Sequence, residues 1–377
     1  MTGFNLIHED TSCRARTGEI LTDRGVVYTP VFMPVGTSAT VKAVHQQELS
    51  SVVKAEIILG NTYHLYLRPG LEVISEAGGL HRFMNWQAPI LTDSGGYQVF
   101  SLSARRKIRP EGVTFQSHID GSKHIFTPES VVDTQRILGS DIMMALDECP
   151  PYPCTRKYAE KSLRITNDWL TRGIQHFINT ESRYGQKQIF VPIAQGSVFD
   201  DLRKESILFN SQYPNPIYAI GGLSVGEPQE ELYRMVAWST EFMPRLSARY
   251  LMGVGTPANL LECIAQGIDM FDCVLPTRNA RHGIIYTTKG IIHIRNQKWK
   301  TDFSMIDEGL DVPTSNLHSK AYLRHLFMVG EILAAQIASI QNLSFYTWLM
   351  REARKQIQLN NFDSWKREIL ITINQKL

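Results

Sequence analysis

Short apolar segments alternate with longer segments of helical periodicity along most of this chain. Stretches such as "TRKYAEKSLRITNDWLTRGIQHF" and "QEELYRMVAWSTEF" repeat apolar residues at three- and four-residue steps, which is typical of amphipathic helices. The short apolar segments between such stretches predict eight strands. They are Val26–Met33, Glu56–Gly60, Pro89–Thr92, Asp141–Leu146, Gln188–Ala194, Ile217–Ile220, Arg249–Met252 and Met270–Val274. This alternation predicts an α/β protein.

Polar residues and glycines follow the predicted strands at their carboxyl ends. They are Asp93, Asp147, Gln195, Gly221, Gly222, Gly253 and Asp272. In a (β/α)8 TIM barrel these ends converge on one face, where active sites lie. A doubly wound sheet would also gather some of them, but it needs a glycine-rich turn after its first strand, and "TPVFMPVGTSAT" contains no GxGxxG. We therefore predict a (β/α)8 TIM barrel.

Two regions depart from this alternation. "GVTFQSHIDGSKHIFT" predicts a hairpin that turns at Asp120-Gly121, and Thr127-Pro128 then starts a helix. After about residue 298 the sequence is irregular and then helical, with separate helices expected at Val329–Ile340 and over "FYTWLMREARKQIQL". We expect a barrel domain at 1–298, a small inserted subdomain at 299–345, and C-terminal helices at 346–377 that pack back on the barrel.

Composition narrows the classes of protein to consider. A hydrophobic content of 43% supports a substantial core, and the apolar runs are too short to cross a bilayer. The start "MTGFNLIHED" shows no secretory signal, and the five scattered cysteines form no CxxC spacing, so we expect a cytoplasmic protein. With a net charge of only +2, nucleic acid would have to bind local basic clusters such as "ARRKIRP", "TRNARHG" and "REARK".

Two aspartates are the leading catalytic candidates. A single aspartate at a strand end is more often a turn or cap residue. Asp93 and Asp272, however, are expected on the same barrel face, beside a glycine-rich loop and a basic loop. A pair of carboxylates suits glycosidic chemistry, in which one attacks the anomeric carbon and the other manages the proton of the leaving group.

The neighbouring residues suit a flat heterocycle. In "DSGGYQ" the glycines would let a ligand approach the backbone and Tyr97 could stack on a base, although a tight turn with a core tyrosine is an equal alternative. Asp147 and Gln195 offer acceptors and a donor to the edge of a ring. "IGGLSVGE" could donate backbone N–H groups to a carbonyl, or bind phosphate as such loops more often do.

Eight segments resemble the tRNA-guanine transglycosylase (queuine tRNA-ribosyltransferase) family. They are "NTYHLYLRPG", "GGLHRFMNWQAPILTDSGGYQVFSL", "ALDECPPYP", "PIAQGS", "AIGGLSVGE", "RYLMGVGTP", "FDCVLPTRNARHG" and "SKAYLRHLF". The resemblance implies a barrel enzyme that exchanges guanine at the wobble position of tRNAs with GUN anticodons for a 7-deazaguanine.

The resemblance also implies roles for individual residues. Asp272 would be the nucleophile on the ribose, and Asp93 the general acid and base. The substrate-binding residues would be Asn61, Ser94, Tyr97, Asp147, Cys149, Gln195, Gly221, Gly222, Leu223, Val225, Glu227 and Met252. The RNA-binding residues would be Gly253, Val254, Gly255, Thr256, Thr277, Arg278, Asn279, Ala280 and Arg281.

Cys149 and Val225 match bacterial members that use the small aminomethyl base preQ1. Members that accept the bulky base queuine have a smaller residue at the second position, so we favour preQ1. Glu227 is expected to help read the ammonium group of that base.

The sequence departs from the family at its zinc site. Anchoring on "SKAYLRHL" puts Leu310, Val312 and Ser315 where the family has cysteines, and Gln341 where it has histidine. Leucine and valine cannot ligate zinc, and neutral serine and glutamine ligate it poorly. We therefore expect no metal or other cofactor, and a subdomain held by apolar contacts. The resemblance also makes a homodimer the expected assembly.

Three other functions stay open. The missing zinc ligands suggest a non-catalytic tRNA-binding partner subunit, against which both aspartates and the complete base pocket count. "IGGLSVG" alone would suit an unrelated phosphate-binding metabolic barrel. An enzyme that exchanges guanine in DNA would need similar chemistry with different polymer contacts.

Overall fold

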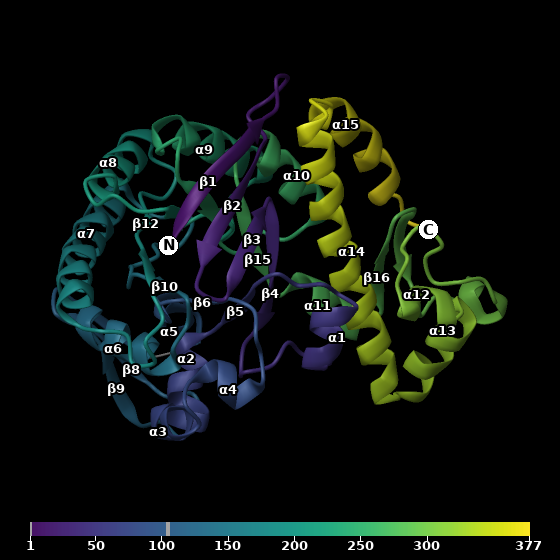
Figure 1. Cartoon of the computed structure of the whole chain (residues 1–377), viewed down its shortest axis with the longest axis horizontal. Helices are drawn as coiled ribbons and strands as arrows, with labels where there is room; N and C mark the ends of the chain where they lie inside the picture. Colours follow the sequence, from purple (N-terminus) through teal and green to yellow (C-terminus); the bar gives the residue numbers. More distant parts are fainter. Residues whose placement is uncertain (1, 103–105) are drawn as a thin grey trace.

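Parallel strands form a closed barrel at the centre of the molecule (Figure 1). The computed structural model describes residues 2–102 and 106–377. Neighbouring strands follow the order β11-β10-β6-β5-β4-β15-β14-β13-β12. Their bounds are β4 Val31–Gly36, β5 Ile58–Gly60, β6 Ile90–Thr92, β10 Ile142–Met144, β11 Ile189–Val191, β12 Ile193–Ala194, β13 Ile217–Ile220, β14 Ala248–Leu251 and β15 Met270–Cys273. Only Pro192 separates β11 from β12, so these two count as one barrel strand. The barrel therefore has the eight strands that were predicted.

Successive side chains of each barrel strand point alternately into the barrel and out toward the surrounding helices. Val31, Met33 and Val35 of β4 pack with inward aliphatic residues of the other strands in one buried cluster. Phe32 points the other way, and its ring centroid lies 4.7 Å from that of Tyr346 in the C-terminal helix α14 (Ile332–Gln358). A fully packed interior leaves the strand ends as the place for a ligand.

The first predicted strand, Val26–Met33, was wrong as a single element. It divides into β3 (Gly25–Thr29) and barrel strand β4, because Pro30 between them cannot donate a ladder hydrogen bond. With β1 (Gly3–Glu9) and β2 (Arg16–Thr22), β3 forms an antiparallel sheet that the sequence analysis did not predict. Ile20 and Val27 of this sheet pack on the interior cluster and close the barrel at the amino ends of its strands.

Helices surround the barrel and one small sheet interrupts them. The helices as far as the last barrel strand are α1 Gln46–Ser51, α2 Thr62–Leu65, α3 Leu71–Glu76, α4 Leu80–Met84, α5 Gly96–Leu102, α6 Pro128–Leu138, α7 Arg156–Asn179, α8 Asp200–Asn210, α9 Gln229–Phe242 and α10 Pro257–Ala265, with a π-helical segment at Tyr66–Gly70. The predicted hairpin is confirmed as β8 (Gly112–Gln116) and β9 (Lys123–Phe126), and β8 also pairs with β7 (Arg106–Arg109). Thr127 caps α6 through a reciprocal bond with Ser130, as predicted.

The C-terminal part forms a side unit that α14 joins to the barrel (Figure 1). Its elements are α11 Leu275–Arg281, β16 Ile284–Thr287, β17 Gly290–His293, a 3-10 helix at Gln297–Thr301, α12 Pro313–Leu317, α13 Lys320–Val329, α14 Ile332–Gln358 and α15 Phe362–Ile373. α14 packs on β4 and α15 on α10, while the final residues return to β17, where Leu377 N donates to Ile291 O at 3.0 Å. No helix in the described residues is long and apolar enough to cross a membrane.

The prediction of two separate helices at 329–340 and 345–359 was wrong. α14 runs unbroken through "QNLS", although these polar residues interrupt the apolar pattern. The interruption is compensated because Asn342 is fully buried and hydrogen-bonded: it donates to Pro276 O and Ile284 O at 3.0 and 2.9 Å and accepts from Tyr286 N at 2.8 Å. The expected domain boundary at 345/346 therefore falls inside a helix.

Candidate active site

A cavity of about 540 Å³ opens at the carboxyl ends of the barrel strands. It brings together most of the residues predicted to bind substrate, although they come from distant parts of the sequence. Those that line it are Asn61, Asp93, Ser94, Tyr97, Asp147, Cys149, Gln195, Gly221, Gly222, Leu223, Val225, Met252 and Asp272. Gly253 and Arg278, predicted to bind RNA, also line it. This volume is in the range of small-molecule sites.

Asp93 follows β6 and is held by the start of α2. Its Oδ1 accepts from Thr62 N at 2.8 Å, and its Oδ2 accepts from Asn61 Nδ2 at 2.5 Å. Burial raises the pKa of Asp93 to about 6, although these hydrogen bonds oppose the shift and the charge of Asp272 adds to it. A carboxyl group with this pKa can both donate and accept a proton near neutral pH.

Asp272 lies at the end of β15 and presents one free oxygen. Its Oδ1 accepts from Tyr250 Oη at 2.6 Å and from Gly253 N at 2.9 Å. Its Oδ2 accepts no hydrogen bond from the described residues. Burial raises the pKa of Asp272, while the bond from Tyr250 opposes the rise. The two donors fix the orientation of the carboxylate and leave Oδ2 available to a reacting centre.

Asp147 and Gln195 form a joint polar edge on another side of the cavity. Gln195 Nε2 donates to Asp147 Oδ2 at 2.6 Å, which assigns the orientation of the amide. Gln195 Oε1 then has no hydrogen-bond donor among the described residues, although Gln195 is fully buried. A Cβ on Gly222 would lie 2.2 Å from that oxygen, so glycine is required beside it. A buried acceptor without a partner indicates a missing donor from a ligand.

The remaining predicted base-binding residues differ in their placement. Tyr97 is 48% exposed, so it offers a ring face at the mouth of the cavity instead of packing in the core. Cys149 is buried, and burial raises the pKa of its thiol, which keeps it neutral. Glu227 does not line the cavity: its carboxylate accepts from the backbone N–H groups of Ser224 and Val225 and fixes their loop.

Many of the predicted RNA-binding residues support the loops from inside. Val254, Thr277 and Ala280 are buried, so RNA could reach only their backbone. Thr256 caps α10 by accepting from Asn259 N at 3.2 Å, and Gly255 O accepts from Tyr346 Oη at 2.5 Å. Two further residues of the predicted RNA-binding set also hold this region together. Asn279 donates to Tyr286 Oη at 2.7 Å, and Arg281 donates to Thr277 O at 2.8 Å. Arg278 is exposed.

The other basic clusters are engaged to different extents. In "ARRKIRP", Arg105 lies outside the described residues, and Arg106 donates to Phe100 O at 2.8 Å. In "REARK", Arg354 pairs with Glu56 at 2.8 Å and donates to two carbonyls, which makes it a structural residue.

Two buried side chains that build the site were not among the residues predicted from the sequence. Arg203 of α8 is fully buried and donates to the carbonyl oxygens of Ala194, Ser197 and Gly221 at 2.7 to 3.2 Å. It thereby joins the loops after β12 and β13 beside the polar edge that Asp147 and Gln195 form. Burial lowers the pKa of Arg203 to about 10. Tyr250, which orients Asp272, could have been found from its inward position on β14, two residues before Met252.

The four positions that carry zinc ligands in the resembled family do not fit a metal here. Leu310 and Val312 are 2% and 6% exposed and pack in the cluster around α14. Ser315 Oγ donates to Gln341 Oε1, and Gln341 Nε2 donates to Tyr286 O at 3.1 Å. Within the described residues, no group of three or more His, Cys, Asp or Glu side chains could hold a metal ion.

The fold and the site define a class of protein: a (β/α)8 barrel enzyme with paired carboxylates over a cavity of nucleobase size. Comparison with known proteins then identifies the family. The family model described as "TGT: Queuine tRNA-ribosyltransferase" matches residues 10–375, so the chain belongs to this family.

Individual relatives match over nearly their full length. The queuine tRNA-ribosyltransferase of Thermoanaerobacter sp. (strain X514) is 51% identical over 365 residues, which cover 97% of this chain and 96% of the relative. That of Aquifex aeolicus (strain VF5) is 50% identical over 387 residues, which cover 100% of both chains. That of Desulforapulum autotrophicum (strain ATCC 43914 / DSM 3382 / VKM B-1955 / HRM2) is 50% identical over 368 residues, which cover 98% of each.

Proposed function

We propose that this protein is a catalytically active tRNA-guanine transglycosylase. It would exchange guanine at the wobble position of tRNAs with GUN anticodons for preQ1, in the cytoplasm. The observation that carries the proposal is the pairing of Asp93 and Asp272 on one cavity that also holds the unsatisfied acceptor of Gln195. A non-catalytic partner subunit would have no use for a nucleophile so carefully oriented.

In the proposed reaction each carboxylate has one part. Oδ2 of Asp272 attacks C1′ of the ribose, the bond from C1′ to the purine nitrogen breaks, and an ester joins the RNA to the protein. Protonated Asp93, with a pKa of about 6, supplies the proton that the departing guanine requires. In the second half, Asp93 takes a proton from the incoming base, whose nitrogen attacks C1′ and releases Asp272.

The polar edge of the cavity fits guanine and its 7-deaza analogue equally. Their amino and ring N–H groups can donate to Asp147 and to Oε1 of Gln195, which then gains the donor it lacks. Leu223 and Met252 line the same cavity and Tyr97 offers its exposed ring for stacking. A base that carries an aminomethyl group would extend toward Cys149 and Val225.

The choice of preQ1 over queuine rests on space. Val225 lines the cavity in a loop that Glu227 pins through two backbone hydrogen bonds, so this side chain cannot easily withdraw. Because Glu227 is engaged in this way, its carboxylate would read the ammonium group only after the loop rearranges. Steric restriction by Val225 is therefore the main support for the smaller base.

We also propose that the protein acts as a homodimer. Eight large apolar side chains between residues 303 and 333 of the C-terminal side unit are exposed, and we call this set the subdomain apolar face: Phe303, Met305, Leu317, Tyr322, Met328, Val329, Ile332 and Leu333. They are 39–78% exposed, which is unusual for so many in one short region. A second copy is the partner that the family suggests.

Asp272→Asn tests the proposed chemistry. Wild-type protein incubated with labelled guanine and a GUN-anticodon tRNA should place label at the wobble position, and stalled mixtures should show a protein–RNA adduct on denaturing gels. Asp272→Asn should lose both signals, with exchange reduced at least ~10³-fold. Asp168→Asn, which changes an exposed carboxylate on α7, is the matched control.

The same assay separates the competing functions. Exchange into DNA alone would support a DNA enzyme, and no exchange into either polymer would support a binding subunit. Incorporation of preQ1 but not queuine is expected from the position of Val225, while equal incorporation of both would overturn the steric argument.

A further inference from the structure

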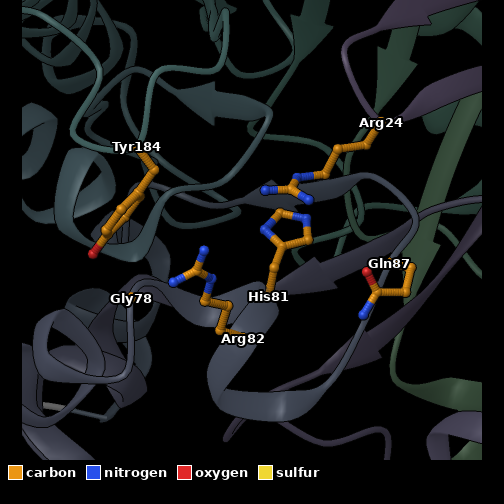
Figure 2. A pocket seen from close by; sticks show the side chains of 6 residues that line it. All are labelled: Arg24, Gly78, His81, Arg82, Gln87 and Tyr184. Atoms are coloured by element: carbon orange, nitrogen blue, oxygen red, sulfur yellow. The ribbon is translucent and has the colours of Figure 1, made fainter.

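A second cavity lies at the opposite end of the barrel from the carboxylates. It has a volume of about 350 Å³ and is lined by Arg24, Gly78, His81, Arg82, Gln87 and Tyr184 (Figure 2). We call it the arginine cavity. Asp141 and Ile90, which lie beside it, stand at the amino ends of β10 and β6, whereas Asp147 and Asp93 follow the carboxyl ends of these strands. The reaction proposed above therefore does not use the arginine cavity.

Two guanidinium groups extend into this cavity from different elements (Figure 2). Arg24 lies in the turn between β2 and β3, and Arg82 lies on α4. Arg24 uses Nε for an ion pair with Asp141 at 3.4 Å, which leaves both of its Nη groups without a hydrogen-bond partner among the described residues. The guanidinium of Arg82 has no hydrogen bond or ion pair within the same residues. The cavity thus holds an excess of unused cationic donors.

The carboxylate of Asp141 offsets the charge of Arg24 only, so the charge of Arg82 stays unpaired among the described residues. Asp141 is fully buried and already accepts from Ile90 N at 2.8 Å, while His81 Nε2 lies 3.2 Å from its Oδ2. Asp23, next to Arg24 on the turn, accepts from Lys187 N at 2.7 Å and does not line the cavity. The cavity therefore retains one unpaired positive charge and free guanidinium N–H groups on both arginines, which an anion between them would pair.

Three glycines leave space in the cavity wall for the side chains of Arg82 and Tyr184. A Cβ on Gly78 would lie 2.9 Å from Cδ and 3.2 Å from Nη1 of Arg82. A Cβ on Gly79 would lie 2.8 Å from the ring of Tyr184, and one on Gly139 would lie 2.6 Å from it. Tyr184 is further fixed because its hydroxyl donates to Ile137 O at 2.8 Å. Arg82 and Tyr184 therefore lie against bare backbone in a defined wall of the cavity.

We propose that the arginine cavity binds a phosphate group through Arg24 and Arg82. The planar guanidinium fork matches two oxygens of a phosphate, and two such forks can share one tetrahedral anion. The source of the phosphate is either a free anion in solution or a backbone phosphate of the tRNA. Both present the same oxygens to the same two side chains.

Arg82→Gln tests this site because Arg82 is exposed and has no partner to lose, so the fold should persist. Calorimetric titration with inorganic phosphate at low ionic strength should show one saturable site in the wild type, weakened about tenfold or more in Arg82→Gln. Arg164→Gln, which removes an exposed arginine on α7, should bind phosphate as the wild type does. Guanine exchange at saturating tRNA in phosphate-free buffer should be unchanged, which separates this site from the proposed function.

Titrating tRNA over a range of salt concentrations identifies the source. If the phosphate belongs to tRNA, Arg82→Gln should weaken tRNA binding and reduce the slope of log affinity against log salt by about 1, while Arg164→Gln should not. If only inorganic phosphate binding weakens, the ligand is a free anion. The proposal is overturned if Arg82→Gln binds both inorganic phosphate and tRNA as Arg164→Gln does.

Discussion

At the residue scale, the burial of the Asp147 carboxylate in the cavity carries an electrostatic cost. Burial raises the pKa of Asp147 from 3.8 to about 6, so the folded state prefers the neutral acid while the unfolded chain ionises near 3.8. The stabilising preference for the neutral form is fully present below pH 3.8 and is lost as the pH rises through about 6. At neutral pH the protein therefore holds this carboxylate ionised at the expense of stability, a common feature of functional sites.

We predict that Asp147→Asn stabilises the protein above pH 6. The amide can still accept from Gln195 Nε2 and can turn its NH₂ group toward Ser94, whose hydroxyl lies 3.4 Å from Asp147 Oδ1. Removing the ionisation should raise the free energy of unfolding by about 1–3 kcal/mol near pH 7.5. Urea unfolding at a series of pH values would measure the gain.

The pH dependence supplies the control for this prediction. The advantage of Asp147→Asn should shrink as the pH falls below about 6 and vanish below about 3.8, whereas the exposed control Asp168→Asn should show no such trend. A gain that did not change with pH, or a loss at all pH values, would contradict the electrostatic explanation. The rate of guanine exchange should fall in the same variant, because the bound base would lose the anionic hydrogen-bond acceptor that Asp147 provides.

At the element scale, a helix and a loop hold together the four positions where the resemblance places zinc ligands. Leu310 and Val312 pack in the apolar cluster around α14, and Ser315 is tied to Gln341 of that helix. Gln341 in turn donates a hydrogen bond to Tyr286 O, so the helix is also linked to β16. Apolar burial and a satisfied polar chain can hold such a unit without the folding energy of a metal.

We predict that this unit folds without zinc and depends on Gln341. Protein purified without chelators should contain well under one zinc per chain, and a chelator should leave the thermal unfolding midpoint unchanged. Gln341→Ala should lower the free energy of unfolding by about 2–4 kcal/mol, because it opens a cavity and strands two buried polar groups. Gln356→Ala, at a less buried position on the same helix, is the control. Stoichiometric zinc or destabilisation by the chelator would refute the prediction.

At the scale of the whole molecule, the sequence predicted the structural features that recur from strand to strand and missed the features that occur only once. Eight barrel strands and the gathering of Asp93, Asp147 and Asp272 followed from polar residues or glycines placed at the ends of apolar runs, a pattern that most barrel strands share. The antiparallel sheet that closes the barrel, the unbroken α14 and buried Arg203 depend on tertiary contacts instead. Arg203 looks like any charged residue on an amphipathic helix until three carbonyl groups, at the ends of β12 and β13, surround it.

The sequence also could not separate loop residues that contact a ligand from those that support the loop. Val254 and Ala280 lie in the same short segments as Gly253 and Arg278, but the first two are buried and the last two line the cavity. Their difference arises from the direction of each Cβ within a folded turn, which spacing along the chain does not encode.

Dimerisation is the property of the whole molecule that the subdomain apolar face makes testable. Ile332 is 77% exposed at the start of α14, so a charge there costs the monomer little but would be buried without a partner in a dimer. We expect sedimentation at micromolar concentrations to show a wild-type dimer and an Ile332→Asp monomer with the same thermal stability of its fold. Leu246→Asp changes a side chain that is 70% exposed outside this face and should remain dimeric. A monomeric wild type, or a dimer that tolerates Ile332→Asp, would show that this surface does not hold two copies together.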